Sequence, residues 1–425
     1  MSDSNRLSAA EAVARLRSGA LTAEQLTRDC LDRAAERASV KAWIYLDPEL
    51  ALAQAREADK AARSGLLAGL PIGVKDVIDT GDMPTEHGSP IYQGNRPFAD
   101  AACVAQVRMA GGTILGKTVT TEFANRFPGA TVHPMNPAHT PGGSSSGSAA
   151  AVADFQVPLG FGTQTGGSTI RPAAFCGVVG YKPSFGEFSR VGIKLQAQNL
   201  DTLGLICRSL DDIPLLRAAL IDMPHRSIDR DATAPRVAIC RTPQWDIADG
   251  ATHALIERTA AKLSAAGATV REVEFAAPFK DIARTHQCVF YYEAAKNYAY
   301  EHLEHRDRVS LVLLDTVLDP GAAIPLDDYI QALETAEAFR GHLDDIFRDV
   351  DVLLTPSAPG EAPEGLGSTG NSAFNATWTL SWCPCVTLPA GSGPKGLPLG
   401  VQLVGQRFAD ERTLDAAAWV EAHLN

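Results

Sequence analysis

Two Gly-Gly-Ser turns constrain this chain more than any other feature of its sequence. They occupy residues 142–144 and 166–168, so their serines lie 24 residues apart. Each turn precedes an apolar segment that can be helical, residues 149–155 and 170–176. Paired glycines adopt dihedral angles that other residues avoid, and a turn that leads into a helix presents free N–H groups to an anion. The pattern therefore predicts two helix starts, each with a serine placed for nucleophilic chemistry.

Around these turns the chain resembles the amidase signature family, a group of serine hydrolases with a Ser-Ser-Lys triad. The two turns, their separation, and the flanking residues 175–177 (FCG) and 182–183 (KP) agree with the family pattern. Residues 69–76 (GLPIGVKD) look like its lysine motif, and residues 396–405 (GLPLGVQLVG) look like its closing segment. The resemblance spans roughly residues 5–420 and is weakest in the middle of the chain.

Composition excludes several classes of partner. With 38 basic and 50 acidic side chains, the formal net charge is −12, which argues against nucleic acid or an anionic membrane as the main partner. No signal peptide and no apolar run of about 18 residues is present, so we predict no transmembrane helix. The eight scattered cysteines are typical of buried thiols in a reducing compartment, which favours a cytoplasmic location. We predict no cofactor and no metal; His302 and His305 are interpreted as surface residues of a charged helix.

The pattern of segments predicts an α/β fold. Helical periodicity alternates with short apolar strands, which is typical of helices on both sides of a sheet. The resemblance implies a large mixed β-sheet sandwiched between layers of α-helices. We expect a single domain over residues 1–425, with N-terminal helices at 5–68, a catalytic core at 69–210, a more variable helical part at 211–350, and closing strands with a C-terminal helix at 351–425.

Two further motifs match well-known patterns but lack their structural context. Residues 111–118 match the GxxxxGK[ST] phosphate loop, yet a helix precedes the glycines and a strand lies inside the motif, so Lys117 is predicted to be structural. Residues 143–147 match GxSxG, which would make Ser145 the nucleophile of an α/β-hydrolase. Two prolines shortly before this motif argue against the central strand that such a nucleophile needs.

Amide hydrolysis needs an activated nucleophile, a proton shuttle and donors for the tetrahedral oxyanion. Ser168 is predicted to be the nucleophile. Pro172 fits the first turn of the following helix, so the donors would lie at a helix N-terminus. The predicted oxyanion hole consists of the backbone N–H groups of Thr165, Gly166, Gly167 and Ser168.

The predicted base is Lys75, which is flanked by apolar residues on a strand that should be buried. An exposed lysine titrates near ~10.4, and burial favours the neutral amine, which can accept a proton. His139, five residues before Ser144, is the alternative base. The resemblance implies that Ser144 bridges Lys75 and Ser168 and follows a cis bond from Gly143.

These residues predict an amidase that hydrolyses the C–N bond of a small-molecule amide, yielding a carboxylate plus ammonia or an amine through an acyl-serine intermediate. Arg171 is three residues after Ser168 at a helix start, as in malonamidase-like members, and could bind a substrate carboxylate. Its alternative role is an internal ion pair with an acidic residue. Whether the protein forms a homodimer stays open.

Two other functions are compatible with parts of the pattern. The chain could be the amidase component of a tRNA-dependent amidotransferase complex. Such components usually carry arginine two residues after the nucleophile, whereas here the spacing is three, which disfavours this function. A catalytically inactive binding protein is disfavoured by the intact set of Lys75, Ser144 and Ser168.

Overall fold

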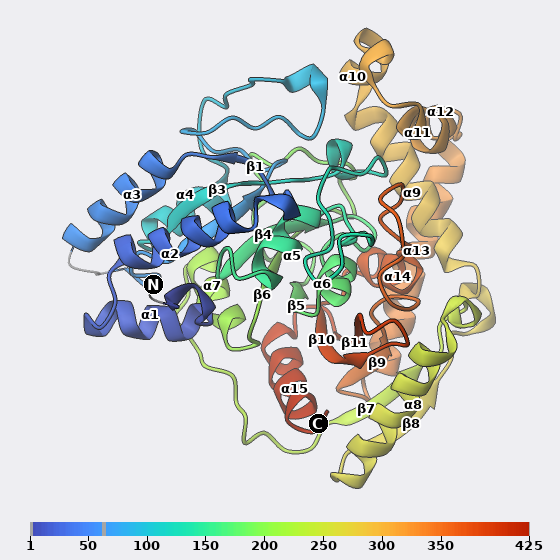
Figure 1. The fold of residues 1–425 in the computed structure, drawn as a ribbon. Helices are drawn as coiled ribbons and strands as arrows, with labels where there is room; N and C mark the ends of the chain where they lie inside the picture. Colours follow the sequence, from blue (N-terminus) through green and yellow to red (C-terminus); the bar gives the residue numbers. More distant parts are fainter. Residues whose placement is uncertain (1–2, 62–64, 425) are drawn as a thin grey trace.

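The computed structural model describes residues 3–61 and 65–424. Within this part of the chain, one sheet lies between layers of helices (Figure 1). The strands are β1 Trp43–Leu46, β2 Pro71–Lys75, β3 Thr113–Thr118, β4 Leu159–Gln164, β5 Val179–Lys182, β6 Thr202–Cys207, β7 Arg236–Cys240, β8 Thr269–Val273, β9 Val352–Pro356, β10 Cys385–Ser392 and β11 Pro398–Gly405. Their order across the sheet is β1-β3-β2-β4-β6-β5-β10-β11-β9-β7-β8.

The sheet contains both parallel and antiparallel pairs. β2 lies parallel to β3 and β4 at one end, and β7 lies parallel to β8 and β9 at the other. The pairs between these ends, from β4–β6 through β5 and β10 to β11–β9, are antiparallel. The predicted α/β class with a mixed sheet is confirmed.

Helices cover the sheet and extend beyond it, and α9 to α13 gather at one side of the molecule (Figure 1). Among the described residues, no helix has both the length and the apolar character needed to cross a bilayer. Two short segments contribute to the site below, the 3-10 helix η4 Glu122–Ala124 and the π-helical turn η8 Leu314–Leu318. The α-helices are α1 Ala9–Ser18, α2 Ala23–Glu36, α3 Pro48–Lys60, α4 Ala102–Met109, α5 Ser146–Ala153, α6 Ile170–Cys176, α7 Asp212–Ile221, α8 Gly250–Ala265, α9 Ile282–Asn297, α10 Ala299–Glu304, α11 Leu311–Leu313, α12 Asp319–Ala322, α13 Leu326–Ile346, α14 Ala373–Leu380 and α15 Asp410–Ala422.

The N-terminal segment departs in one place from the helices predicted for residues 5–68. Local signals hold for α1, where Ser8 and Glu11 form a reciprocal capping box. Residues 43–46, however, form β1 and pair antiparallel with β3. The aromatic and β-branched side chains of this short segment favour a strand once an edge is available to pair with. Residues 62–64 of the predicted segment lie outside the described residues.

The middle of the sheet supports two short buried helices. α5 packs on β4 and β2, and α6 packs on β5, β10 and β11. Nearly every residue of both helices is buried. Alanines and glycine make up most of α5, so the helix can approach the sheet closely. Because both helices begin at the Gly-Gly-Ser turns, this packing brings the two turns to the same region of the fold.

Candidate active site

The two Gly-Gly-Ser turns lie next to each other. The Ser145 N–H donates to the Ser168 carbonyl at 3.2 Å. Gly142 has a φ of 84°, a left-handed conformation that glycine adopts without strain, and the Gly143–Ser144 peptide bond is cis. At the second turn, a Cβ on Gly167 would lie 2.3 Å from Asn375 Oδ1, so a side chain does not fit there. The local geometry therefore requires glycine at position 142 in the first turn and at position 167 in the second.

Lys75 ends β2 directly beneath the first turn. Its Nζ lies 2.7 Å from Ser144 Oγ and 2.7 Å from Thr163 Oγ1. The side chain is completely buried, and this desolvation holds the pKa of Lys75 well below its usual range, against an opposing contribution from Asp201. A neutral amine in contact with a serine hydroxyl can accept its proton.

In the second turn, the carbonyl groups of residues 165–167 accept hydrogen bonds from other groups of the protein. His286 Nε2–H donates to Thr165 O at 2.8 Å, and burial lowers the His286 pKa to about 4, so the ring is neutral near pH 7. Thr379 Oγ1 donates to Gly166 O at 2.8 Å, and the Arg171 N–H donates to Gly167 O at 2.9 Å. Within residues 3–61 and 65–424, the N–H groups of residues 165–168 have no hydrogen-bond acceptor. These N–H groups are therefore free to bind a ligand oxygen.

Ser168 opens onto a cavity of about 300 Å³. The serine is 9% exposed, whereas Lys75 and Ser144 are 0% and 1% exposed and do not line the cavity. No hydrogen bond joins the Ser144 and Ser168 hydroxyls in this structure, so that half of the proton relay stays a prediction. The walls come from segments far apart in the sequence. They are residues 124–126 at the end of η4, residues 165–168 with Arg171, Gln196, the helical residues Phe290, Val312 and Thr316, and loop residues 367–370 with Ser372.

Arg171 is buried beside Ser168. One of its nitrogens, Nη2, donates to Gly143 O at 2.7 Å and to Thr369 Oγ1 at 3.1 Å, while Nε is buried without a partner. No carboxylate among the described residues pairs with this guanidinium, so the alternative of an internal ion pair is wrong. Burial, and then the charge of Arg126, lower the Arg171 pKa to about 10, which still leaves it protonated near pH 7.

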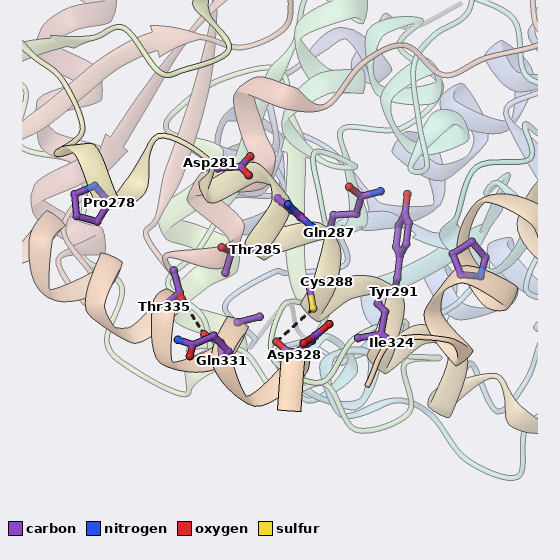
Figure 2. A pocket seen from close by; sticks show the side chains of 13 residues that line it. Pro278, Asp281, Thr285, Gln287, Cys288, Tyr291, Ile324, Asp328, Gln331 and Thr335 are labelled. Atoms are coloured by element: carbon purple, nitrogen blue, oxygen red, sulfur yellow. Dashed lines mark hydrogen bonds between the residues drawn. The ribbon is translucent and has the colours of Figure 1, made fainter. Parts of the chain in front are cut away.

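A larger cavity of about 560 Å³ lies elsewhere, between α9 and α13 (Figure 2). None of the three predicted triad residues lines it. Its thiol, Cys288, contacts the Asp328 carbonyl at 3.7 Å, and burial raises the pKa of this thiol, which makes it a poor nucleophile. The smaller cavity at Ser168 is therefore the candidate active site.

The phosphate-loop match at residues 111–118 and the GxSxG match at residues 143–147 have structural roles. Lys117 lies on β3, completely buried, and its Nζ donates to Ile78 O at 2.7 Å, so it cannot reach a phosphate. Ser145 is also completely buried, and its Oγ accepts from the Thr163 N–H at 3.2 Å. The alternative base, His139, binds the Ala362 carbonyl through Nδ1 at 2.7 Å and does not line the cavity.

Sequence reasoning missed three residues of this site. Thr163 contacts Lys75, and Asp201 accepts from Thr165 Oγ1 at 2.5 Å beneath the second turn. Arg126 lines the cavity from the loop after η4. Thr163 stands five residues before Ser168. Side chains alternate between the two faces of a strand, and this alternation along β4 could have identified Thr163 from the sequence. No local pattern marks Asp201 or Arg126.

Comparisons with known proteins show the family and the fold of this chain. The Amidase family profile matches residues 25–414. A glutamyl-tRNA(Gln) amidotransferase subunit from Lysinibacillus sphaericus (strain C3-41) is 32% identical over 96% of this chain and 94% of its own length. A crystal structure of an amidase superimposes with a TM-score of 0.90 and 31% identity, covering 99% of this chain and 100% of the other. The native peptide amidase from Stenotrophomonas maltophilia superimposes with a TM-score of 0.80 and 29% identity, covering 98% and 96%.

Proposed function

The chain belongs to the amidase family, and from this premise we propose that Ser168 is the nucleophile that attacks the carbonyl of a small amide. The observation that carries the proposal is the 2.7 Å contact between the buried Lys75 amine and Ser144 Oγ, beside the turn that holds Ser168. Lys75 acts as the neutral base, and Ser144 relays the proton. Catalytic hydrogen bonds are often long in an unliganded enzyme and shorten when substrate binds. The missing hydrogen bond between the Ser144 and Ser168 hydroxyls is consistent with this behaviour.

The proposed reaction has two balanced halves. The Ser168 hydroxyl adds to the amide carbon while its proton passes through Ser144 to Lys75, and the N–H groups of residues 165–168 bind the oxyanion. Collapse breaks the C–N bond, and the proton returns through Ser144 to the leaving nitrogen. Water then adds to the acyl-serine by the same relay and releases the carboxylate product.

Asp201→Asn is expected to move the acid limb of the kcat/KM profile to lower pH. The charge of Asp201 raises the Lys75 pKa, so removing it lowers that pKa, and the neutral amine persists to lower pH. Asp212→Asn is the matched control. Burial raises the pKa of both Asp201 and Asp212 to about 6, but the Asp212 carboxylate binds the N–H groups of Ala10 and Ser209. Equal movement of the acid limb in both variants would contradict the role of Asp201.

For the substrate we propose an amide that carries a carboxylate, bound by Arg171. Its guanidinium lies beside Ser168 without an acidic partner among the described residues, and arginine holds a carboxylate through two parallel hydrogen bonds. Arg171→Ala is expected to cost roughly 2–5 kcal/mol of transition-state binding for a carboxylated amide and much less for its neutral counterpart.

Steady-state kcat/KM on matched amides, with and without the carboxylate, measures this difference. Arg171 also holds the Gly143 carbonyl, so part of any loss can come from displacement of the first turn. Such displacement affects both amides alike. Equal losses on the two amides would therefore remove the carboxylate from the proposal and leave Arg171 a structural role.

The second candidate function is that of the amidase component of a tRNA-dependent amidotransferase. The identity of 32% to a protein of an amidotransferase favours it. Hydrolysis of a panel of primary amides by the purified chain alone supports the free-standing enzyme; activity only with added partner proteins supports the amidotransferase. The mass of the active species in the same experiment tests the homodimer. All eight cysteines are free thiols, and we propose a cytoplasmic location on that ground.

A further inference from the structure

A second arginine, Arg126, lines the cavity at Ser168, near enough for its charge to lower the pKa of Arg171. This side chain comes from the loop after η4 and is exposed, whereas Arg171 is buried. Arg126 Nη2 donates to the hydroxyl of Tyr291 at 2.6 Å. Tyr291 stands on α9. Its ring extends away from Cys288, which lines the larger cavity between α9 and α13 (Figure 2). The two arginines therefore lie at different depths of one cavity, Arg171 at the floor and Arg126 at the mouth.

No acidic side chain of the described residues balances these two charges. The cavity lining contains no Asp or Glu, and Arg126, like Arg171, takes part in none of the ion pairs found in this part of the chain. Asp201 lies behind Thr165, where its carboxylate is occupied by Thr165 Oγ1 and by the Gln196 N–H at 2.6 Å. Two like charges that share a small cavity repel each other, and a ligand with negative charge relieves that repulsion.

Polar atoms in the cavity wall are also left without partners. Arg171 Nε, both amide atoms of Asn125, and Gln196 Oε1 are buried and form no hydrogen bond within the described residues. Buried polar groups in native proteins nearly always have a partner. These residues all line the same cavity, so its wall offers polar groups to a ligand.

We propose that the preferred substrate is an amide that carries two carboxylates, the first bound by Arg171 beside Ser168 and the second by Arg126 at the mouth. This inference rests on the proposed function and extends it to the whole cavity. The difference in depth favours two separate anionic groups over one group shared by both guanidiniums. Tyr291 occupies only one nitrogen of Arg126, which leaves the others for a bidentate contact.

The experiment compares three amides of matched length, with no, one and two carboxylates, on the wild type, Arg126→Gln, Arg126→Lys and Arg96→Gln. We expect wild-type kcat/KM to rise with each carboxylate. Arg126→Gln should lower kcat/KM about tenfold or more for the dicarboxylate and leave the other two within about threefold. Arg126→Lys should retain part of the preference. Arg96 is exposed and outside the cavity, so Arg96→Gln controls for the loss of one surface charge.

Three outcomes separate the possibilities. Equal losses on the mono- and dicarboxylates in Arg126→Gln would mean that Arg126 only attracts anions to the cavity, which overturns the second site. A wild type that hydrolyses amides without preferring the dicarboxylate also overturns it and leaves the proposed function intact. A wild type that hydrolyses none of the amides and is not labelled at Ser168 by a serine-reactive phosphonate overturns the proposed function itself.

Discussion

Ser168→Ala is expected to abolish measurable turnover while the protein remains folded. Without the hydroxyl no acyl-serine forms, and loss of a nucleophile from such a set typically lowers kcat by about 10³–10⁶-fold. The change removes one oxygen from a cavity wall, so the fold should tolerate it. Initial rates on the best amide, together with thermal unfolding of the same sample, check both parts of this prediction.

A serine-reactive phosphonate gives the matching positive result. Mass spectrometry should locate the adduct on Ser168 in the wild type and find none in Ser168→Ala. Ser145→Ala is the control, since Ser145 is completely buried and should still permit labelling at Ser168. An adduct on Ser145 instead would restore the α/β-hydrolase interpretation of the GxSxG motif.

Lys75→Met is expected to lower kcat by several orders of magnitude. Methionine fills a similar space but cannot accept a proton, so the Ser144 relay loses its base. In the wild type the fraction of neutral Lys75 grows as pH rises through its depressed pKa, so kcat/KM should rise with pH along the acid limb. Lys117→Met changes a second completely buried lysine, on the adjacent strand, and should spare kcat in the folded fraction.

The same substitution tests the pKa through stability. Because the folded-state pKa of Lys75 lies below its unfolded value, the unfolded chain binds more protons between the two, and this group destabilises the fold near pH 7. That destabilisation fades as pH rises toward ~10.4. The free energy of unfolding of Lys75→Met, relative to wild type, should therefore fall as pH rises. A constant difference, or an acid limb removed by His139→Ala rather than by changes at Lys75, would contradict the neutral base.

Local sequence signals were sufficient to predict several parts of this fold. The helix starts after both Gly-Gly-Ser turns and the strand at β3 follow from glycine conformation and apolar runs, which act over a few residues. The same context correctly placed a strand inside residues 111–118, where β3 covers Thr113–Thr118, and so argued against a phosphate loop. Local signals misassigned residues 43–46, because that strand depends on an edge supplied by β3.

The sequence by itself therefore predicted which residues do the chemistry, and packing decided where their side chains lie. Lys75 and Ser144 are 69 residues apart in the chain, and only the position of β2 beneath α5 brings Nζ within 2.7 Å of the hydroxyl. The depressed pKa of Lys75 comes from burial, which belongs to the whole fold. The same holds for the cavity that gathers Arg126 and Arg171: its walls come from segments distant in sequence, and no local pattern records which of their side chains lack a partner.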